Sequence, residues 1–432
     1  MINTTVDLSD LRPYQRESFD FCTRVRNPYL NMDCGLGKSL VGVKLIQRYR
    51  KPTLVVAPKN VALYTWPEEF DKWDLDVPYQ VICGTVKQRF MAVGFDVPVH
   101  VISYSNLAWL VANCPWKWQF VILDEISFLK SSGSTRFRAF KKIRPKIGKV
   151  VGMSATPAVN HIEALWAQYY CLDMGKTLSK FVTHFRNRYL TRVGEGYGQY
   201  VPRRGARRDI LAKVKPSMLS IRAEDHLDQL PKITHQNHYF TMQRTTEYEE
   251  MERDSVITDL DILAGSAGVK SMKLRQLASG FIYATGAEET HVLSDDKINA
   301  FDEVYQSIKQ HQVLVFYQFE AERNLLLERY EGVTLEKGGK DMWNSGYAPM
   351  LVCHPQSAGH GLNMQESNAF HVIWFSSPWD GELYLQGCGR LRRSGNERER
   401  VISHRIIAAT TIEMRVHAVL DKRLKEHEEM MT

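Results

Sequence analysis

A short glycine-containing stretch, "GLGKS" at positions 35–39, carries the residue types of a phosphate-binding loop. It follows the apolar run "YLNMD" and precedes the apolar-periodic run "LVGVKLIQRY", which predicts the order strand, loop, helix. Glycines let several backbone N–H groups point at one phosphate, and the helix N-terminus adds the positive end of its dipole. Lys38 would then neutralise the β- and γ-phosphates, and Ser39 would offer a hydroxyl to Mg²⁺. Because Met32 stands where the usual pattern has its first glycine, a tight turn with a solvated lysine is the alternative.

Two acidic residues end an apolar run further along the chain. The run "FVILDE" places Asp124 and Glu125 at the carboxyl edge of a predicted buried strand. An aspartate delivered there suits a residue that holds Mg²⁺, and the glutamate after it can orient and activate water. Two solvated carboxylates at an exposed strand end are the alternative. Because the glycine loop and the acid pair fall in one strand–helix region in this order, together they favour a nucleotide site.

The elements that must position these residues are predicted from apolar runs that alternate with segments of helical spacing, such as 61–73. In the first half of the chain, predicted strands begin at Thr53, Val99, Phe120 and Lys149. In the second half, they begin at Gln312, Pro349, His371 and Ser403. Buried strands that alternate with helices predict parallel α/β sheets, in which function gathers at the carboxyl ends of the strands.

The alternation is interrupted in the middle of the chain, and a length of 432 residues favours two or three domains. Pro231 interrupts any helix near the expected hinge. We therefore expect an N-terminal α/β lobe over 1–228, with a helical and basic insertion at about 172–228. A C-terminal lobe over 229–432 is expected to hold a helical insertion at about 237–295. The basic stretch "PRRGARRD" at 202–209 either extends a nucleic-acid contact or forms a solvated loop.

Composition narrows the class of protein. Hydrophobic residues make up 44% and aromatic residues 11%, as in folded globular domains. A net charge of +7 is compatible with a polyanionic partner without demanding one. The seven cysteines stand singly, which argues against a disulfide framework and a structural zinc site. With a polar N-terminus and no apolar run of about 18 residues, we expect a soluble cytoplasmic protein with no membrane partner.

An ordered series of short motifs resembles superfamily-two helicases, and within them the Snf-type DNA translocases related to chromatin remodellers. In the first half the motifs are "LRPYQ" from 11, "MDCGLGKS" from 32, "VVAPKNVALYTWPEEFDKW" from 55, "VISYSNL" from 101, "LDEIS" from 123 and "MSATPAVNHIEALW" from 153. In the second half they are "VLVFYQF" from 313, "SAGHGLNMQESNAFHVIWFSSPWD" from 357, "QGCGRLRRSGN" from 386 and "TIEMRV" from 411. Each motif alone is weak, but the ordered series over nearly the whole chain is specific.

This resemblance implies two RecA-like lobes that bind ATP and Mg²⁺ between them, and it implies roles for individual residues. The nucleotide would be bound by Gln15, Gly35, Leu36, Gly37, Lys38, Ser39 and Gly361. Mg²⁺ would be held by Ser39 and Asp124. Hydrolysis would be carried by Lys38, Asp124, Glu125, Gln386, Arg390 and Arg393. One nucleic-acid strand would contact Lys59, Asn60, Ser103, Tyr104, Gln318, Ser357, Gly359 and Asn363. Hydrolysis would be coupled to strand grip by Ser154 and Thr156.

The sequence departs from the family pattern at two places. Ile126 and Ser127 stand where motif II usually has Ala-His, and His360 stands where motif V commonly has a small residue. The expected activity is an ATP-driven motor that tracks along duplex DNA without sequence preference. The alternatives are a strand-separating or fork-remodelling helicase, an RNA-dependent ATPase and a non-catalytic ATP-gated clamp. The compact chain favours a phage or bacterial motor in the bacterial or infected-host cytoplasm, working with a separate nuclease or a replication or recombination protein.

Overall fold

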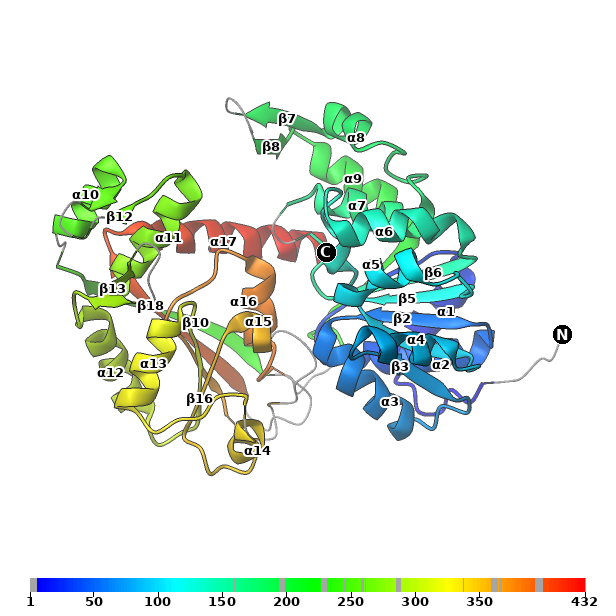
Figure 1. Ribbon diagram of the computed structural model, residues 1–432, viewed down its shortest axis with the longest axis horizontal. Helices are drawn as coiled ribbons and strands as arrows, with labels where there is room; N and C mark the ends of the chain where they lie inside the picture. Colours follow the sequence, from blue (N-terminus) through cyan, green and yellow to red (C-terminus); the bar gives the residue numbers. More distant parts are fainter. Residues whose placement is uncertain are drawn as a thin grey trace. The chain divides into compact units, whose positions relative to one another are not determined.

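The computed structural model divides the chain into two compact units (Figure 1). Unit 1 comprises Met1–Asp228 and Glu426–Thr432, and unit 2 comprises Gln229–Lys425. The last seven residues, which the sequence analysis placed in the second lobe, thus group with unit 1. The structure describes residues 6–158, 161–193, 199–226, 231–243, 246–257, 260, 262–284, 289–336, 338–358, 364, 367, 369–392 and 399–431.

Unit 1 is built on a seven-stranded parallel sheet with the strand order β3-β4-β2-β5-β6-β1-β9. The strands are β1 (Tyr29–Met32), β2 (Thr53–Ala57), β3 (Tyr79–Ile82), β4 (Val99–Ser103), β5 (Phe120–Asp124), β6 (Lys149–Ser154) and β9 (Met218–Ile221). Because β6 lies between β1 and β5, the carboxyl ends of these three strands meet side by side at one edge of the sheet. This edge is where the glycine loop and the acid pair are found.

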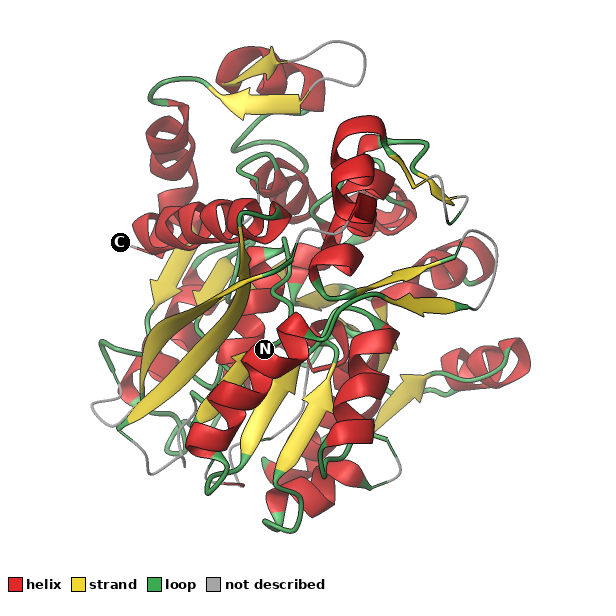
Figure 2. Ribbon diagram, turned by 90° about the vertical axis from the view of Figure 1, so that its left-hand side faces the viewer, coloured by secondary structure: helices red, strands yellow, loops and turns green. Residues whose placement is uncertain are grey.

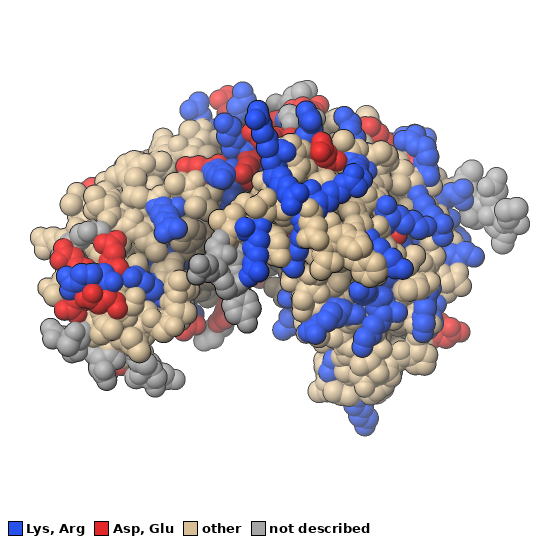
Figure 3. Space-filling model, turned by 90° about the horizontal axis from the view of Figure 1, so that it is seen from above, with Lys and Arg blue, Asp and Glu red and all other residues tan. Residues whose placement is uncertain are grey.

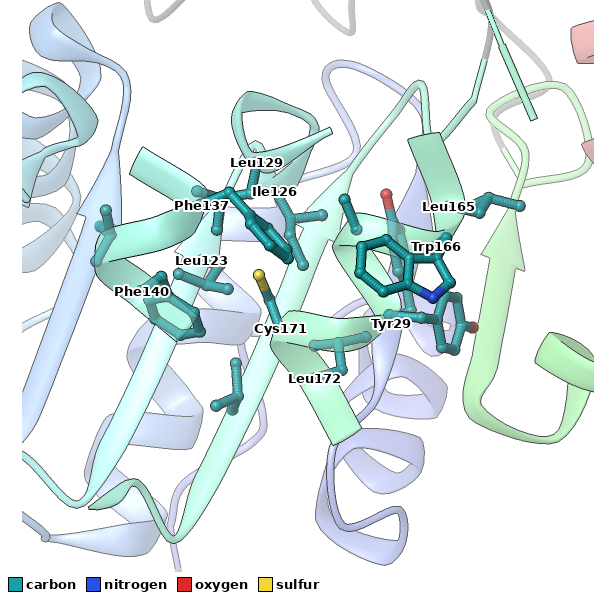
Figure 4. Packing of buried hydrophobic residues seen from close by; sticks show 14 of the residues in the cluster. Tyr29, Leu123, Ile126, Leu129, Phe137, Phe140, Leu165, Trp166, Cys171 and Leu172 are labelled. Carbon is teal, nitrogen blue, oxygen red and sulfur yellow. The ribbon is translucent and has the colours of Figure 1, made fainter. Parts of the chain in front are cut away.

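Helices cover both faces of this sheet. They are α1 (Pro13–Arg24), α2 (Lys38–Tyr49), α3 (Trp66–Lys72), α4 (Val86–Gly94), α5 (Tyr104–Asn113), α6 (Thr135–Ile143) and α7 (Ala164–Asp173). Side chains alternate along β5, so that Val121 and Leu123 join the apolar cluster of α5, α6 and α7, whereas Ile122 lies toward α2 on the other face. Figure 4 shows the first of these faces, where Leu123 lies among side chains of α6 and α7.

The insertion in unit 1 is less helical than predicted. It consists of α8 (Val182–Tyr189), the hairpin strands β7 (Leu190–Val193) and β8 (Gln199–Pro202), and α9 (Ala206–Val214), after which β9 joins the main sheet beside β1. The sequence analysis missed β9 because this strand is only partly buried and its run "MLSI" is short. Apolar side chains of α8 and α9 join the same cluster as α6 and α7, so the insertion is anchored to the face that these helices cover.

Unit 2 contains a five-stranded parallel sheet with the order β10-β18-β17-β15-β16. Its strands are β10 (Lys232–Thr241), β15 (Val313–Phe316), β16 (Met350–Cys353), β17 (His371–Trp374) and β18 (Arg400–Ala409). The main helices are α12 (Asp296–Ile308), α13 (Glu320–Arg329), α14 (Gly339–Asn344), α15 (Pro355–Ala358), α16 (Gly381–Cys388) and α17 (Ile412–Met431). The sequence analysis did not predict β10, because an edge strand with mostly exposed side chains lacks the apolar run of a central strand.

The insertion in unit 2 is mixed rather than helical throughout. It comprises α10 (Thr246–Asp254), β11 (Val256–Ile257), β12 (Ile262–Leu263), α11 (Ala267–Ala278), β13 (Phe281–Tyr283) and β14 (Thr290–Val292). The predicted fold class, two parallel α/β sheets flanked by helices, is confirmed (Figure 2). Among the described helices, none combines the length and the apolar character that crossing a bilayer requires.

Candidate nucleotide site and nucleic-acid face

The glycine loop joins β1 to α2 and uses backbone conformations that favour glycine. Gly35 has a φ of 84° and Gly37 a φ of 76°, both in the left-handed region. A Cβ on Gly37 would also lie 2.4 Å from the side-chain nitrogen of Gln15. Both glycines are therefore demanded by local geometry, and the missing first glycine at Met32 falls within β1, where no turn is needed.

Lys38, the first residue of α2, folds back over this loop. Its Nζ donates to the carbonyl oxygens of Met32 at 2.7 Å and Asp33 at 3.1 Å. The carboxylate of Asp33 in turn accepts from the backbone N–H of Ala223 at 2.9 Å, just beyond β9. Among the described residues, the ammonium therefore makes its hydrogen bonds to neutral carbonyls and not to a carboxylate, which an incoming phosphate could replace.

Gln15 connects helix α1 to the same loop. Its Oε1 accepts from the N–H of Arg12 at 2.9 Å, and its Nε2 donates to the carbonyl of Leu36 at 2.9 Å. An amide oxygen has a second lone pair and an amide nitrogen a second hydrogen. Gln15 therefore keeps one acceptor and one donor position for a further partner, which is the pair of groups that reading an adenine edge requires.

Asp124 stands at the end of β5 and is half-buried. The indole Nε1 of Trp66, from α3, donates to its Oδ2 at 2.9 Å. Burial raises the pKa of Asp124, and the nearby positive charge of Lys38 and the Trp66 hydrogen bond oppose that rise. A carboxylate that is withdrawn from water and held by neutral donors gains from a bound cation. The hydroxyl of Ser39 and this carboxylate are also the oxygen ligands that Mg²⁺ prefers.

Glu125 follows directly and is held in a strained position. Its φ of 58° is unusual for a residue other than glycine. One of its oxygens, Oε1, accepts from the hydroxyl of Ser127 at 2.8 Å and from the hydroxyl of Ser154 at the end of β6. Burial raises the pKa of Glu125, while these two donors and Lys38 lower it. The carboxylate is therefore oriented by motif II and motif III together.

The order of strands explains why these groups meet. Asn31 of β1 pairs with Ser154 of β6, and Met153 of β6 pairs with Asp124 of β5. One edge of the sheet therefore carries Lys38, Asp124 and Glu125. Phosphate binding, metal binding and activation of water are the chemistry that this set of groups can perform.

Comparison with known proteins identifies the family. A family model described as the SNF2-related domain matches residues 14–285. The chain belongs to the SNF2-related family. The p41 protein of Acyrthosiphon pisum secondary endosymbiont phage 1 is 30% identical to this SNF2-related chain over 95% of both chains. The ISWI chromatin-remodelling complex ATPase of Saccharomyces cerevisiae is 22% identical over 94% of this chain, which spans only 39% of the yeast protein.

A solved structure of a Sulfolobus solfataricus SWI2/SNF2 ATPase core in complex with dsDNA is 21% identical to the chain. The match covers 98% of this chain and 93% of that one, with a TM-score of 0.48. The two parallel-sheet units of the present SNF2-related chain correspond to the two RecA-like lobes that its motif series predicted.

The predicted nucleic-acid residues of unit 1 differ in their exposure. Lys59 and Asn60 are exposed directly after β2. Ser103 is buried, with its hydroxyl 2.8 Å from that of Ser105. Tyr104 is 1% exposed and its ring stacks on Phe128 at 5.1 Å, so its side chain belongs to the core of unit 1. Of the four nucleic-acid contacts predicted in unit 1 of this SNF2-related chain, Lys59 and Asn60 are therefore the exposed ones.

In unit 2, Gln318 is partly exposed after β15, and Ser357 is exposed on α15 after β16. Gln386 on α16 and Arg390 just beyond it are 2% and 3% exposed. Within the described residues, Oε1 of Gln386 has no hydrogen-bond partner. The remaining predicted positions lie outside the described residues; they are Gly359, Gly361, Asn363 and Arg393.

Sequence reasoning missed a buried charged network in unit 2 of this SNF2-related chain. Lys297 of α12 pairs with Glu413 of α17, and its Nζ also donates to Ser376 at 2.8 Å. Ser376 donates to Glu322 at 2.6 Å, and the second oxygen of Glu322 accepts from the N–H of Gln318 at 2.8 Å. The network thereby fixes the backbone of the motif IV loop.

The sequence also did not predict that Trp66 donates a hydrogen bond to Asp124. The only signal available was general: a tryptophan that is fully buried must place its indole N–H against an acceptor. Neither its spacing nor its neighbours indicates that the acceptor is Asp124, because 58 residues separate the two.

Proposed function

We propose that this SNF2-related protein is a DNA-dependent ATPase that translocates along duplex DNA. The observation that carries the proposal is the meeting of Lys38, Asp124 and Glu125 at one sheet edge, each held by a specific partner. Support for DNA as the polymer comes from the relatives: the yeast protein is a chromatin-remodelling ATPase, and the Sulfolobus core is described in complex with dsDNA.

In the proposed reaction, the residues of unit 1 hold ATP and prepare water. Lys38 exchanges its loop carbonyls for the β- and γ-phosphates, and Ser39 and Asp124 hold Mg²⁺. When bound, Mg²⁺ supplies charge that stabilises the phosphoryl oxygens. Glu125, whose two serine donors favour its ionised form, accepts a hydrogen bond from the attacking water and orients it.

Residues of unit 2 complete the charge balance in this proposal. We assign to Arg390 and Arg393 the neutralisation of the charge that develops on the γ-phosphate, and to Gln386 the second contact to water. An arginine finger of this kind contributes on the order of 10³–10⁵ in rate. The buried oxygen of Gln386, which has no hydrogen-bond partner among the described residues, is consistent with a partner supplied during the reaction.

Coupling to DNA would run through Ser154. Its hydroxyl donates to Glu125 and accepts from the backbone N–H of Thr156 at 3.0 Å, so that a shift of the segment after β6 must move the glutamate. The residues proposed to hold one strand are Lys59, Asn60, Gln318, Ser357, Gly359 and Asn363. Such groups contact the phosphodiester backbone and do not read sequence. Ser103 and Tyr104, the other two predicted contacts, are buried where β4 ends beside the end of β2.

The test is the rate of ATP hydrolysis with no polymer, duplex DNA, single-stranded DNA, forked DNA and RNA, measured for the wild type and Lys38→Ala. We expect duplex DNA to give the strongest stimulation and Lys38→Ala to abolish it, with the exposed Lys51→Ala as a matched control that retains it. Stimulation by RNA alone, or activity that survives in Lys38→Ala, would contradict the proposal.

Translocation is tested separately from hydrolysis. A motor that tracks along duplex DNA displaces a third strand from a triplex in an ATP-dependent manner, without separating the two strands of a duplex. Strand separation of a forked substrate at a comparable rate would instead assign the protein to the helicases that unwind.

A further inference from the structure

The positive charge of the chain is concentrated in one region. Residues 130–217 contain 19 Lys and Arg against four Asp and Glu, whereas the rest of the chain contains 37 against 45. The net charge of +7 is therefore the sum of one strongly basic region and an acidic remainder. Such a local surplus is the electrostatic signature of a surface that meets a polyanion.

These residues form one continuous part of unit 1. Phe137 and Phe140 of α6, Trp166 of α7, and Phe185 of α8 belong to one apolar cluster, which also takes in Ile210 of α9. The aromatic side chains are turned inward, and this leaves the basic side chains of the same elements outside. Figure 3 shows Lys and Arg side chains spread over the visible face of unit 1, in the right-hand half of the view, with few Asp and Glu among them.

Several basic side chains of this region are bound to carbonyls or carboxylates of the protein itself. Arg144 is buried and donates to the carbonyls of Cys171, Leu172 and Ile147. Arg186 pairs with Glu163, and Arg207 pairs with Glu426.

The exposed basic residues remain after these are set aside. They are Arg138, Lys141, Lys142, Lys146, Lys176, Lys180, Arg188, Arg203, Arg204, Arg208, Lys213 and Lys215, which we call the accessory surface. Within the described part of the region, the one acidic partner of this set is Asp209, which lies 3.7 Å from Arg208 at a position where the arginine side chain is 88% exposed. The charge of the surface is therefore largely uncompensated.

Aromatic and apolar side chains are exposed among these charges. Phe181 before α8 is 51% exposed, Val193 of β7 53% and Tyr200 of β8 38%. The guanidinium of Arg186 lies 4.5 Å from the centre of the Tyr200 ring and holds it in place. An isolated two-stranded hairpin with apolar side chains in water gains from being covered. A surface of basic residues with aromatic ones among them is typical of nucleic-acid-binding proteins.

We propose that the accessory surface is a second binding surface for the backbone of duplex DNA, separate from the motif residues proposed above to hold one strand. The proposal rests on the proposed function, because it takes DNA to be the polymer on which the motor acts. The surface would hold a neighbouring stretch of duplex through phosphate contacts and so raise affinity without adding sequence preference.

The three arginines best suited to a test come from the two sides of the hairpin and from α9. The backbone N–H of Arg203 donates to the carbonyl of Tyr189 at 2.9 Å, which ties the segment of Arg188 to that of Arg204, and Arg208 follows on α9. All three are exposed, and none serves the nucleotide site. The test variant is Arg188→Gln/Arg204→Gln/Arg208→Gln. The control, Arg24→Gln/Arg48→Gln/Lys51→Gln, removes the same charge from exposed positions on or beside α1 and α2.

The measurement is the affinity of the full chain for a fluorescent duplex across a salt titration, together with the rate of ATP hydrolysis without DNA. We expect the test variant to bind roughly 10-fold more weakly at low salt and to lose about 2–3 from the slope of log K against log salt, since each phosphate contact contributes about 0.9. The control should keep the wild-type slope, and both variants should keep the wild-type rate of hydrolysis without DNA.

Three results would overturn the inference. If duplex DNA stimulates the wild type and the test variant keeps wild-type affinity and slope, the accessory surface does not bind DNA, while the proposed function stands. If test and control lose affinity equally, overall charge rather than this surface is responsible. If the wild type neither binds nor responds to duplex DNA, the proposed function fails and the accessory surface fails with it.

Discussion

Each unit buries charged side chains beside its parallel sheet, and the two sets are satisfied in different ways. In unit 1, Lys38 is held by backbone carbonyls, and the carboxylates of Asp124 and Glu125 are held by neutral donors. In unit 2, Lys297 is paired directly with Glu413. In unit 1, the charged groups are held by neutral partners and can still pair with a ligand. In unit 2, the cation and the anion already neutralise each other.

The difference separates a binding site from a structural network. Burial raises the pKa of both acids in unit 1, which means that the folded chain holds two carboxylates at a cost in stability. A protein tolerates such a cost where a ligand or a reaction later uses the charge. The buried groups of unit 2 are paired with one another instead: Lys297 contacts both Glu413 and Ser376, and Ser376 contacts Glu322. Mutations should therefore affect activity in unit 1 and stability in unit 2.

The largest expected effect is on hydrolysis in unit 1. Glu125→Gln keeps the shape of the side chain and removes the base, so kcat should fall on the order of 10²–10⁴-fold. The free energy of unfolding should stay equal or rise, because a strained, buried carboxylate is replaced by a neutral amide. Steady-state ATP hydrolysis and a urea titration measure the two quantities. The exposed Glu68→Gln on α3 is the matched control. A variant that keeps its kcat, or that loses several kcal/mol of stability, would break the distinction between the two units.

The next effect is on stability in unit 2. Lys297→Met leaves Glu413 buried without its cation, which should cost about 3–5 kcal/mol of unfolding free energy. The double variant Lys297→Met/Glu413→Gln should recover much of that loss, because position 413 then carries no unpaired charge. The measurement is urea denaturation of the full chain. Lys309→Met, at the exposed end of the same helix, should change stability little. Equal losses for Lys297→Met and the double variant would show that packing rather than charge pairing matters there.

A third effect concerns pH and also belongs to unit 2. His404 of β18 makes ring-nitrogen hydrogen bonds with His238 at 3.0 Å and with His371 at 2.9 Å. Burial lowers the pKa of His371 to about 4 and that of His404 to about 3, and neighbouring histidines add to the shift.

Because the unfolded chain binds protons near pH 6.5 and the folded chain does not, stability is retained above that pH. It should fall as the pH drops toward about 4, by about 1.4 kcal/mol per pH unit for each histidine. The measurement is urea denaturation between pH 7.5 and 4.5. His404→Gln should flatten the dependence, and the exposed His184→Gln should leave it unchanged. A stability that is constant, or that rises on acidification, would contradict the assignment.

The sequence predicted the parts of the molecule whose causes are local. Apolar runs predict central strands such as β4 and β6. The glycines around Gly37 predict the loop, because its left-handed backbone favours glycine. The edge strand β10 was not predictable in this way, since its exposed side chains are polar. The pairing of Lys297 with Glu413 joins positions 116 residues apart, and charged residues in a helical segment ordinarily predict a solvated face. Only the folded structure shows that Lys297 and Glu413 form a buried ion pair.

The smallest expected effect addresses Ser127, where the family pattern has a histidine. Ser127 and Ser154 donate to the same oxygen of Glu125, and both lower the pKa of that carboxyl. A hydrogen bond to a charged group is worth about 1.5–3 kcal/mol, but Ser154 continues to donate in Ser127→Ala, so kcat should fall only about 3–10-fold.

The more telling result of Ser127→Ala is the pH profile. Loss of a donor to the ionised form raises the pKa of Glu125, so the acidic limb of kcat/KM should move to higher pH. Ser154→Ala should shift it in the same direction and also weaken the response to DNA, because the two hydrogen bonds of Ser154 connect Glu125 to Thr156. The exposed Ser131→Ala serves as the control. If Ser127→Ala lowers kcat without moving the acidic limb, Ser127 maintains the local fold of motif II and does not tune its base.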